Sequence, residues 1–152
     1  MIIDKNIGFI GLGNVGSRLA NSVLLSNFNL FVHDLRKESA NKLIERGAIW
    51  APNFKYLLEN CSIIITCLPS PKAATDVING KNGLVHYINK KHLWIEMSTT
   101  DENEMKKLTT LVEAKGSSVL ECPVTGGAHL SETGNITVFA AGKRKVFDRA
   151  FS

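Results

Sequence analysis

Three glycines near the N-terminus have the spacing of a phosphate-binding loop. The sequence GLGNVG places Gly11, Gly13 and Gly16 directly after the apolar run Ile7–Ile10. In such a turn the first glycine permits the bend, the second lets the backbone approach a pyrophosphate, and the third allows a helix to pack closely on a strand. A helix beginning near Asn14 would point its free N–H groups at the phosphates. The flanking strand and amphipathic helix supply the context that the glycines alone lack.

An acidic residue follows at the distance expected for a ribose-binding carboxylate. Asp34 directly follows the second apolar run, Leu30–His33, and stands 18 residues after Gly16. There it would accept hydrogen bonds from the adenosine ribose and repel the 2′-phosphate of NADP, which favours NAD. Arg36 keeps NADP open, because a guanidinium can pair with that phosphate. A turn or helix cap at Asp34 and a purely structural glycine loop are the alternatives; together the two features predict dinucleotide binding.

The rest of the chain alternates short apolar runs with helical patterns. Strands are expected at residues 7–10, 30–33, 48–50, 62–68, 93–97, 117–122 and 136–141. Helices are expected at residues 15–25, 37–46, 73–77 and 102–115, with another beginning at residue 143. This order predicts an α/β fold of the Rossmann type over residues 1–152, a doubly wound, mostly parallel sheet with helices on both faces.

Composition favours an ordinary globular domain. The 152 residues are 44% hydrophobic and 21% charged, with a formal net charge of +4, and the basic residues are dispersed. A nucleic-acid binder usually concentrates them in a stripe, so no nucleic-acid partner is expected. The cluster of Lys143, Arg144 and Lys145 is interpreted as the solvated start of a surface helix.

The cysteines and the hydropathy of the sequence indicate where in the cell the protein is expected. Cys61, Cys67 and Cys122 form no CxxC pair and no metal-ligand spacing, so they are interpreted as core residues in a reducing compartment, and no metal is expected. No apolar stretch approaches the ~20 residues of a membrane span. A strand begins almost at once, which leaves no room for a signal peptide. We therefore expect a cytoplasmic protein without a membrane partner.

Five motifs together resemble one enzyme family, the β-hydroxyacid dehydrogenases, and within it the 3-hydroxyisobutyrate dehydrogenases. GFIGLGNVG is similar to the family's GFIGLGxMG, TCLPSP (66–71) to its MLP turn, and EMSTTD (96–101) to its DxST segment. ECPVTGG (121–127) resembles DAPVSGG, and GNITVFAAG (134–142) resembles GxLTxMVGG. The motifs cover essentially the whole chain. The resemblance to 6-phosphogluconate dehydrogenase is weaker, because that enzyme's DGGN segment is absent.

The resemblance implies a cofactor site and part of a substrate site. The cofactor residues it implies are Gly11, Leu12, Gly13, Asn14, Val15, Gly16, Asp34, Leu68, Pro69 and Thr99. The substrate residues it implies are Thr125, Gly126 and Gly127, whose hydroxyl and N–H groups can bind an anion. The chain departs from the family at four positions: Val15 for methionine, Ala73 for asparagine, Glu102 for proline and Thr125 for serine.

The same resemblance places the catalytic lysine outside this sequence. In the family it lies on a helix beyond the last strand, before an all-helical domain that the sequence lacks, so neither Lys143 nor Lys145 is assigned that role. No catalytic residue is predicted. We expect an NAD(P)-binding domain acting with a small β-hydroxy acid, inactive alone, with a homo-oligomer left open. The alternatives are a non-catalytic dinucleotide-binding or interaction module, and the cofactor domain of a related imine or aldehyde reductase.

Other polar and aromatic residues receive structural interpretations. His33 is placed in the second strand, far from the nicotinamide, and His86 and His92 on the surface; only His129 falls near the predicted site. Glu102 and Glu104 are expected on a solvated helix face without partners. Trp50 and Trp94 are interpreted as core or sheet-edge residues.

Overall fold

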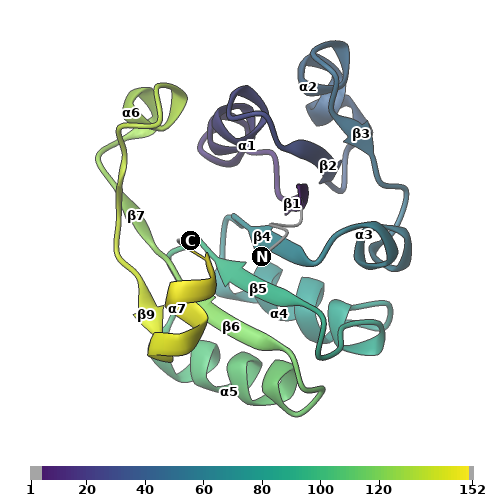
Figure 1. Cartoon of the computed structure of the whole chain (residues 1–152), viewed down its shortest axis with the longest axis vertical. Coiled ribbons are helices and arrows are strands. Elements are labelled where there is room, and N and C mark those ends of the chain that lie inside the picture. The colour runs from purple at the N-terminus through teal and green to yellow at the C-terminus, as the bar shows by residue number, and fades with distance from the viewer. Residues whose placement is uncertain (1–4, 151–152) are drawn as a thin grey trace.

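The computed structural model describes residues 5–150 and shows a seven-stranded sheet with helices on both faces (Figure 1). Its strands are β1 (Asn6–Ile10), β2 (Asn29–His33), β3 (Ile49–Trp50), β4 (Ile63–Thr66), β5 (Leu93–Glu96), β6 (Ser118–Glu121) and β9 (Ala141–Gly142). The order is β3-β2-β1-β4-β5-β6-β9, and all neighbours are parallel except β9, which runs antiparallel to β6. The predicted Rossmann-type fold is confirmed. The strand order reverses between β1 and β4, which is where such sheets bind ligands.

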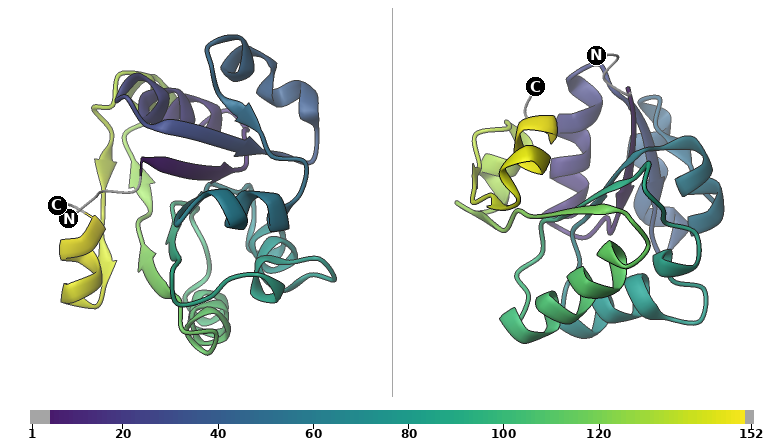
Figure 2. Two further views of the ribbon diagram at one scale, coloured as in Figure 1. Left: turned by 45° about the vertical axis from the view of Figure 1, so that its right-hand side comes forward. Right: turned by 60° about the horizontal axis from the view of Figure 1, so that its bottom comes forward.

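Helices cover the two faces of the sheet. They are α1 (Gly16–Leu25), α2 (Asn41–Glu45), α3 (Phe54–Asn60), α4 (Pro71–Asn79), α5 (Glu102–Glu113), α6 (Ala128–Glu132) and α7 (Arg144–Ala150), with 3₁₀ turns η1 (Lys37–Ala40) and η2 (Leu84–His86). Figure 2 shows α1 and α7 on one side of the sheet and α4 and α5 on the other.

The core has a layer on each side of the sheet, because the strands are apolar on both faces. On the α1 side, Phe9 packs with residues such as Leu19 and Leu43. On the α4 and α5 side, the fully buried Trp94 packs among residues such as Leu108. A smaller cluster, Leu93, Leu120, Cys122 and Val146, lies under α7.

Local capping explains where three helices begin. Asn53 accepts a hydrogen bond from the N–H of Tyr56 at the start of α3, and Ser70 does the same for Ala73 at the start of α4. Asp101 caps α5. Each of these side chains satisfies an N–H that the helix itself leaves unpaired. Helix α1 has no side-chain cap, and the N–H groups of Ser17 and Arg18 bond to the carbonyl oxygens of Gly13 and Val15, so the donors left for a ligand are those of the turn just before them.

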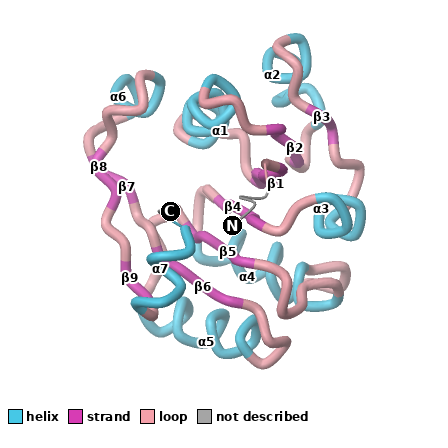
Figure 3. Tube along the Cα trace, in the orientation of Figure 1, coloured by secondary structure: helices cyan, strands magenta, loops and turns pink. Residues whose placement is uncertain are grey.

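Four elements differ from the sequence predictions. The strand expected at 136–141 divides: β8 (Thr137–Val138) pairs with β7 (Val124–Thr125) in a separate two-stranded sheet, and β9 rejoins the main sheet (Figure 3). Helices α3 and α6 were not predicted. The Asn53 cap marked α3, but the segment was interpreted as a connection opened by Pro52. Helix α4 begins at Pro71, not Ala73, because a proline at the first helical position is favourable.

Candidate functional site

A cavity of about 920 Å³ opens at the carboxyl ends of the strands, at the point where the strand order reverses. The predicted cofactor residues that line it are Gly11, Gly13, Asn14, Val15, Gly16, Asp34, Leu68, Pro69 and Thr99. Leu12 is buried behind the loop. Ala73, where the family has an asparagine, also lines the cavity and adds no hydrogen-bonding group. Residues from three separate motifs thus share one cleft.

Each glycine of the loop has a steric reason to lack a side chain. Gly11 has φ +95°, and a Cβ there would overlap the carbonyl oxygen of Cys67. A Cβ on Gly16 would overlap the carbonyl oxygen of Gly11, so the start of α1 lies directly against the end of β1. Gly13 is exposed, with no described atom within 4 Å of the place for a Cβ. The turn is therefore tight on its protein side and open toward the cavity, as a pyrophosphate cradle requires.

Asp34 joins the glycine loop to the end of β2. Its Oδ2 accepts a hydrogen bond from the N–H of Leu12 at 2.8 Å, and its Oδ1 accepts one from the N–H of Arg36 at 2.9 Å. Each carboxylate oxygen has a second lone pair, so both can still accept a ribose hydroxyl. Arg36 also lines the cavity. Asp34 thus has a structural role in shaping the loop in addition to its predicted ribose contact.

His33 also lines the cavity, on the β2 side next to Asp34. Its Nδ1 lies 2.8 Å from the carbonyl oxygen of Ala51, so the proton sits on that nitrogen. The ring stacks on Trp50, with centroids 5.4 Å apart, and meets the Phe54 ring edge-on at 4.9 Å. The sequence analysis did not predict this aromatic cluster, in which His33 and Trp50 end β2 and β3 and Phe54 begins α3.

The expected surface position of His92 is wrong. The residue is 4% exposed, its Nδ1 accepts the N–H of Asn89, and its Nε2 donates to the carbonyl oxygen of Leu58 at 2.9 Å. His86 and His129 are exposed. The expectation of unpartnered acids on α5 is also wrong: the two acids, Glu102 and Glu104, bond to Lys106 and to the hydroxyl of Thr75 respectively.

A buried carboxylate lies beneath the cleft, and sequence reasoning missed it. Glu96 ends β5 fully buried; its Oε2 accepts the Thr66 hydroxyl at 2.8 Å, and its Oε1 accepts the N–H of Ser98 at 2.7 Å. Burial is the main cause that raises the pKa of Glu96, the hydrogen bonds from Ser98 and Thr66 oppose it, and the nearby charge of Glu121 adds to the rise.

Two of the three cysteines occupy the core, as predicted. Cys61 and Cys122 are buried, whereas Cys67 is half-buried and lines the cavity directly after β4. Burial, with a smaller contribution from the charge of Glu96, raises the pKa of the Cys67 thiol to about 11. The thiol therefore stays protonated near neutral pH and is a poor nucleophile.

The predicted substrate loop lies beside the cavity and does not line it. Thr125, Gly126 and Gly127 are exposed, and both glycines have positive φ angles, +124° and +84°. The hydroxyl of Ser22 on α1 donates to the carbonyl oxygen of Ser131 on α6 at 2.8 Å. Because α6 follows the loop directly, this bond holds the loop close to the helix that begins at the phosphate turn.

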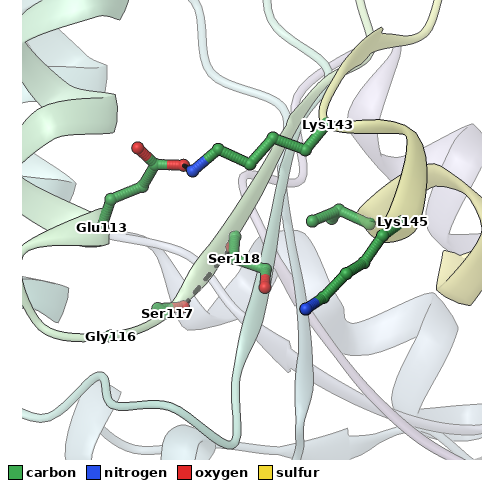
Figure 4. Close-up of a pocket in the computed structure, with 7 residues that line it drawn as sticks. Glu113, Gly116, Ser117, Ser118, Lys143 and Lys145 are labelled. Atoms are coloured by element: carbon green, nitrogen blue, oxygen red, sulfur yellow. Dashed lines mark hydrogen bonds and ion pairs between the residues drawn. The ribbon is translucent and has the colours of Figure 1, made fainter.

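A second cavity, of about 330 Å³, lies at the opposite edge of the sheet (Figure 4). Lys143 and Glu113 form an ion pair of 2.7 Å across it, while Lys145 extends its amine toward Ser118. None of the predicted site residues borders it. Within residues 5–150 there is no cluster of three metal-ligating side chains and no helix long and apolar enough to cross a membrane.

Comparison with known families decides the class of this cleft. A family model described as the NAD binding domain of 6-phosphogluconate dehydrogenase matches residues 6–152. The chain belongs to that family. It is therefore an NAD-binding domain of the dehydrogenase type, and the resemblance predicted from its motifs is confirmed at this level.

Individual relatives extend well beyond the region that they share with this chain. The cytokine-like nuclear factor N-PAC of Pongo abelii is 32% identical over 145 residues, which are 95% of this chain and 26% of that protein. A probable mitochondrial 3-hydroxyisobutyrate dehydrogenase of Dictyostelium discoideum is 32% identical over 147 residues, 97% of this chain and 46% of that protein. The chain thus spans less than half the length of either relative.

Solved structures share the fold of this chain. Psf3 in complex with NADP⁺ and 2-OPP superposes with a TM-score of 0.90 at 26% identity, covering 93% of this chain and 50% of that one. An imine reductase variant from Myxococcus stipitatus in complex with NAD⁺ superposes with a TM-score of 0.87 at 15% identity, over 96% of this chain and 50% of that one, which shows a shared fold.

Proposed function

We propose that this chain supplies the cofactor half of an NAD(P)-dependent oxidoreductase that moves a hydride between nicotinamide and a small β-hydroxy acid such as 3-hydroxyisobutyrate. The cofactor supplies the hydride chemistry, and the protein binds and orients it. The observation that carries the proposal is the shared cleft, where the glycine loop, Asp34, the Leu68–Pro69 turn and Thr99 line one cavity. The D. discoideum relative supports the substrate class.

The cleft suggests how the dinucleotide lies. The pyrophosphate would contact Gly13 and the uncapped start of α1, and the adenosine ribose would contact Asp34. The nicotinamide half then extends the other way, toward Leu68, Pro69 and Thr99. A substrate carboxylate would bind the exposed loop of Thr125, Gly126 and Gly127, which α6 holds close to α1.

The proton relay is assigned to a residue outside the described part of the chain. The described residues that line the cavity include no lysine, and the thiol of Cys67 stays protonated. The family resemblance implies a lysine on a later helix, so we expect this chain alone to bind cofactor and to turn over little or no substrate. The cytoplasmic location likewise stays a prediction.

Calorimetric titration and a substrate assay test the proposal. We expect NADH or NADPH to bind this chain at a 1:1 ratio, with no measurable oxidation of 3-hydroxyisobutyrate by this chain. Absence of binding at millimolar cofactor would overturn the cofactor site, and turnover by this chain would overturn the assignment of the relay.

A related reductase is the second candidate, favoured by the imine reductase among the structural neighbours. It shares the cofactor half, so the discriminating assay uses the longest natural chain that contains this sequence. Oxidation of β-hydroxy acids supports the first proposal, and reduction of cyclic imines without hydroxy-acid oxidation supports the second. Cofactor binding without either activity would favour a non-catalytic binding module, and one similar protein is indeed named as a nuclear factor and not as an oxidoreductase.

A further inference from the structure

Glu96 has no place in the proposed function, yet its hydrogen bonds lead to two loops of the cleft. Thr66 ends β4, immediately before the segment that contains Leu68 and Pro69, and Ser98 follows β5, immediately before Thr99. The N–H of Leu68 donates to the Ser98 hydroxyl at 2.6 Å, which links the two segments to each other. Leu68, Pro69, Ser98 and Thr99 all line the cavity.

The donors and acceptors fix the direction of this network. The indole Nε1–H of Trp94 donates to the Thr66 hydroxyl oxygen at 2.8 Å, since an indole nitrogen cannot accept. The single hydroxyl proton of Thr66 is therefore left for Glu96. On the other side, Glu96 accepts the N–H of Ser98. The carboxylate is thus the terminal acceptor for donors from both strand ends.

We propose that Glu96 is a positioning residue that locks the Leu68–Pro69 turn to the Ser98–Thr99 segment, so that the two together hold the nicotinamide half of the dinucleotide. The inference rests on the proposed orientation of the cofactor in the cleft. It assigns a role to a side chain that itself stays buried under the cavity floor.

The energetic cost of this carboxylate argues against a purely architectural role. The charged group that acts on Glu96 is Glu121, its register partner on β6, and the charge of Glu96 in turn acts on the Cys67 thiol after β4. Among the described residues, no cation donates a hydrogen bond to Glu96. The parallel ladder already joins β4 to β5, with Thr66 opposite Glu96. The backbone ladder continues to the N–H groups of Cys67 and Met97, the first residues beyond the two strands. The N–H group of Ser98 is bonded instead to the Glu96 carboxylate, so an apolar residue at position 96 would leave it unpaired.

Binding of two ligands separates positioning from general stability. NADH spans the whole cleft, whereas ADP carries only the adenosine and the pyrophosphate. In Glu96→Gln one of the two acceptor oxygens becomes an NH₂ donor, so either the Ser98 N–H or the Thr66 hydroxyl proton loses its acceptor. We expect the affinity for NADH to fall at least about tenfold, while the affinity for ADP stays within about twofold. Calorimetric titration of each variant with each ligand measures both.

A second variant and a control keep the test decisive. Thr66→Val removes the hydroxyl at nearly constant volume and should reproduce the selective loss, and the double variant should lose little more than either single one. The matched control is Ser117→Ala, which removes another buried hydroxyl, bonded to the carbonyl oxygen of His92 at the opposite edge of the sheet. It should leave both affinities unchanged.

The outcomes distinguish this inference from the proposal beneath it. Equal losses of NADH and ADP affinity, or no loss of either in folded Thr66→Val, would overturn the positioning role while leaving the cofactor site standing. Failure of the unaltered chain to bind either ligand would overturn the cofactor site, and the positioning role with it. Circular dichroism establishes that each variant is folded before it is titrated.

Discussion

The two edges of the central sheet are built from similar strands and differ in what they leave unsatisfied. At the carboxyl edge, α1 begins without a side-chain cap, Gly13 faces open space and a cavity of about 920 Å³ remains. At the amino edge, the smaller cavity is crossed by the ion pair of Lys143 and Glu113. The carboxyl edge therefore has free hydrogen-bond donors for a ligand, whereas at the amino edge Lys143 and Glu113 bond to each other.

The buried titratable residues repeat this contrast. His92, before β5, bonds through both ring nitrogens to backbone groups and holds a turn in place. Glu96, at the other end of the same strand, bonds to groups that continue into the cavity lining. One strand thus carries a structural residue at its start and a residue poised beneath the cleft at its end.

The largest effect is expected from Gly13→Asp. The site has room for the side chain, so the fold should persist, but the new carboxylate would face the pyrophosphate. Such a like-charge contact costs several kcal/mol, so NADH affinity should fall about a hundredfold or more in calorimetric titration. The control is Lys145→Glu at the amino edge, which changes more charge and should leave the affinity intact; equal losses would contradict the separation of the two edges.

His92→Ala should lower the stability of the fold and leave the NADH affinity unchanged. Loss of two buried hydrogen bonds and of the ring volume should lower the free energy of unfolding by about 2–4 kcal/mol. Urea denaturation measures this change. NADH affinity at a temperature where the variant is folded should match that of the unaltered chain, and a clear drop would show that the amino edge contributes to binding.

Arg36→Ala addresses the adenosine end of the cleft. Its guanidinium is exposed beside Asp34 and can reach a 2′-phosphate. We expect NADPH affinity to fall about tenfold, as loss of a charge-assisted bond predicts, with NADH affinity little changed. Lys37→Ala, the neighbouring cation, is the control. A parallel loss of both cofactors would contradict a 2′-phosphate role.

Stability should depend on pH through Glu96. Its pKa is raised above the ordinary 4.5 in the folded state, so its contribution is greatest below the unfolded pKa and is lost as pH rises through the folded pKa. The free energy of unfolding of the unaltered chain, relative to Glu96→Gln, should therefore decrease as pH increases over that interval. Denaturation at several pH values measures this difference. A difference that stays constant with pH would contradict a pKa of Glu96 that is raised by folding.

The smallest effect is expected at the amino-edge ion pair. Both side chains of the Lys143–Glu113 pair are partly solvated, with 72% and 36% of their surface exposed. Exposed pairs contribute at most about 1 kcal/mol. Lys143→Met should thus change the free energy of unfolding by less than about 1 kcal/mol and leave cofactor binding unchanged.

Local patterns predicted most of the fold and the floor of the site. The glycine spacing and the β-branched run of β4 depend on neighbours in the sequence, and both led to correct elements. The contacts that join β4 to β5 do not: nothing local marks Glu96 as buried, because its partners Thr66 and Ser98 meet it only when the strands align. His92 was misplaced for the same reason, since its acceptor on Leu58 is distant in sequence.

Backbone amide shifts in an ¹⁵N-labelled chain titrated with NADH test the central claim most directly. We expect the largest shifts at Gly13, Gly16, Leu68 and Thr99, and no shifts at the amino-edge residues 116–118 and 143–146. Shifts concentrated at the amino edge, or no shifts at millimolar NADH, would contradict it.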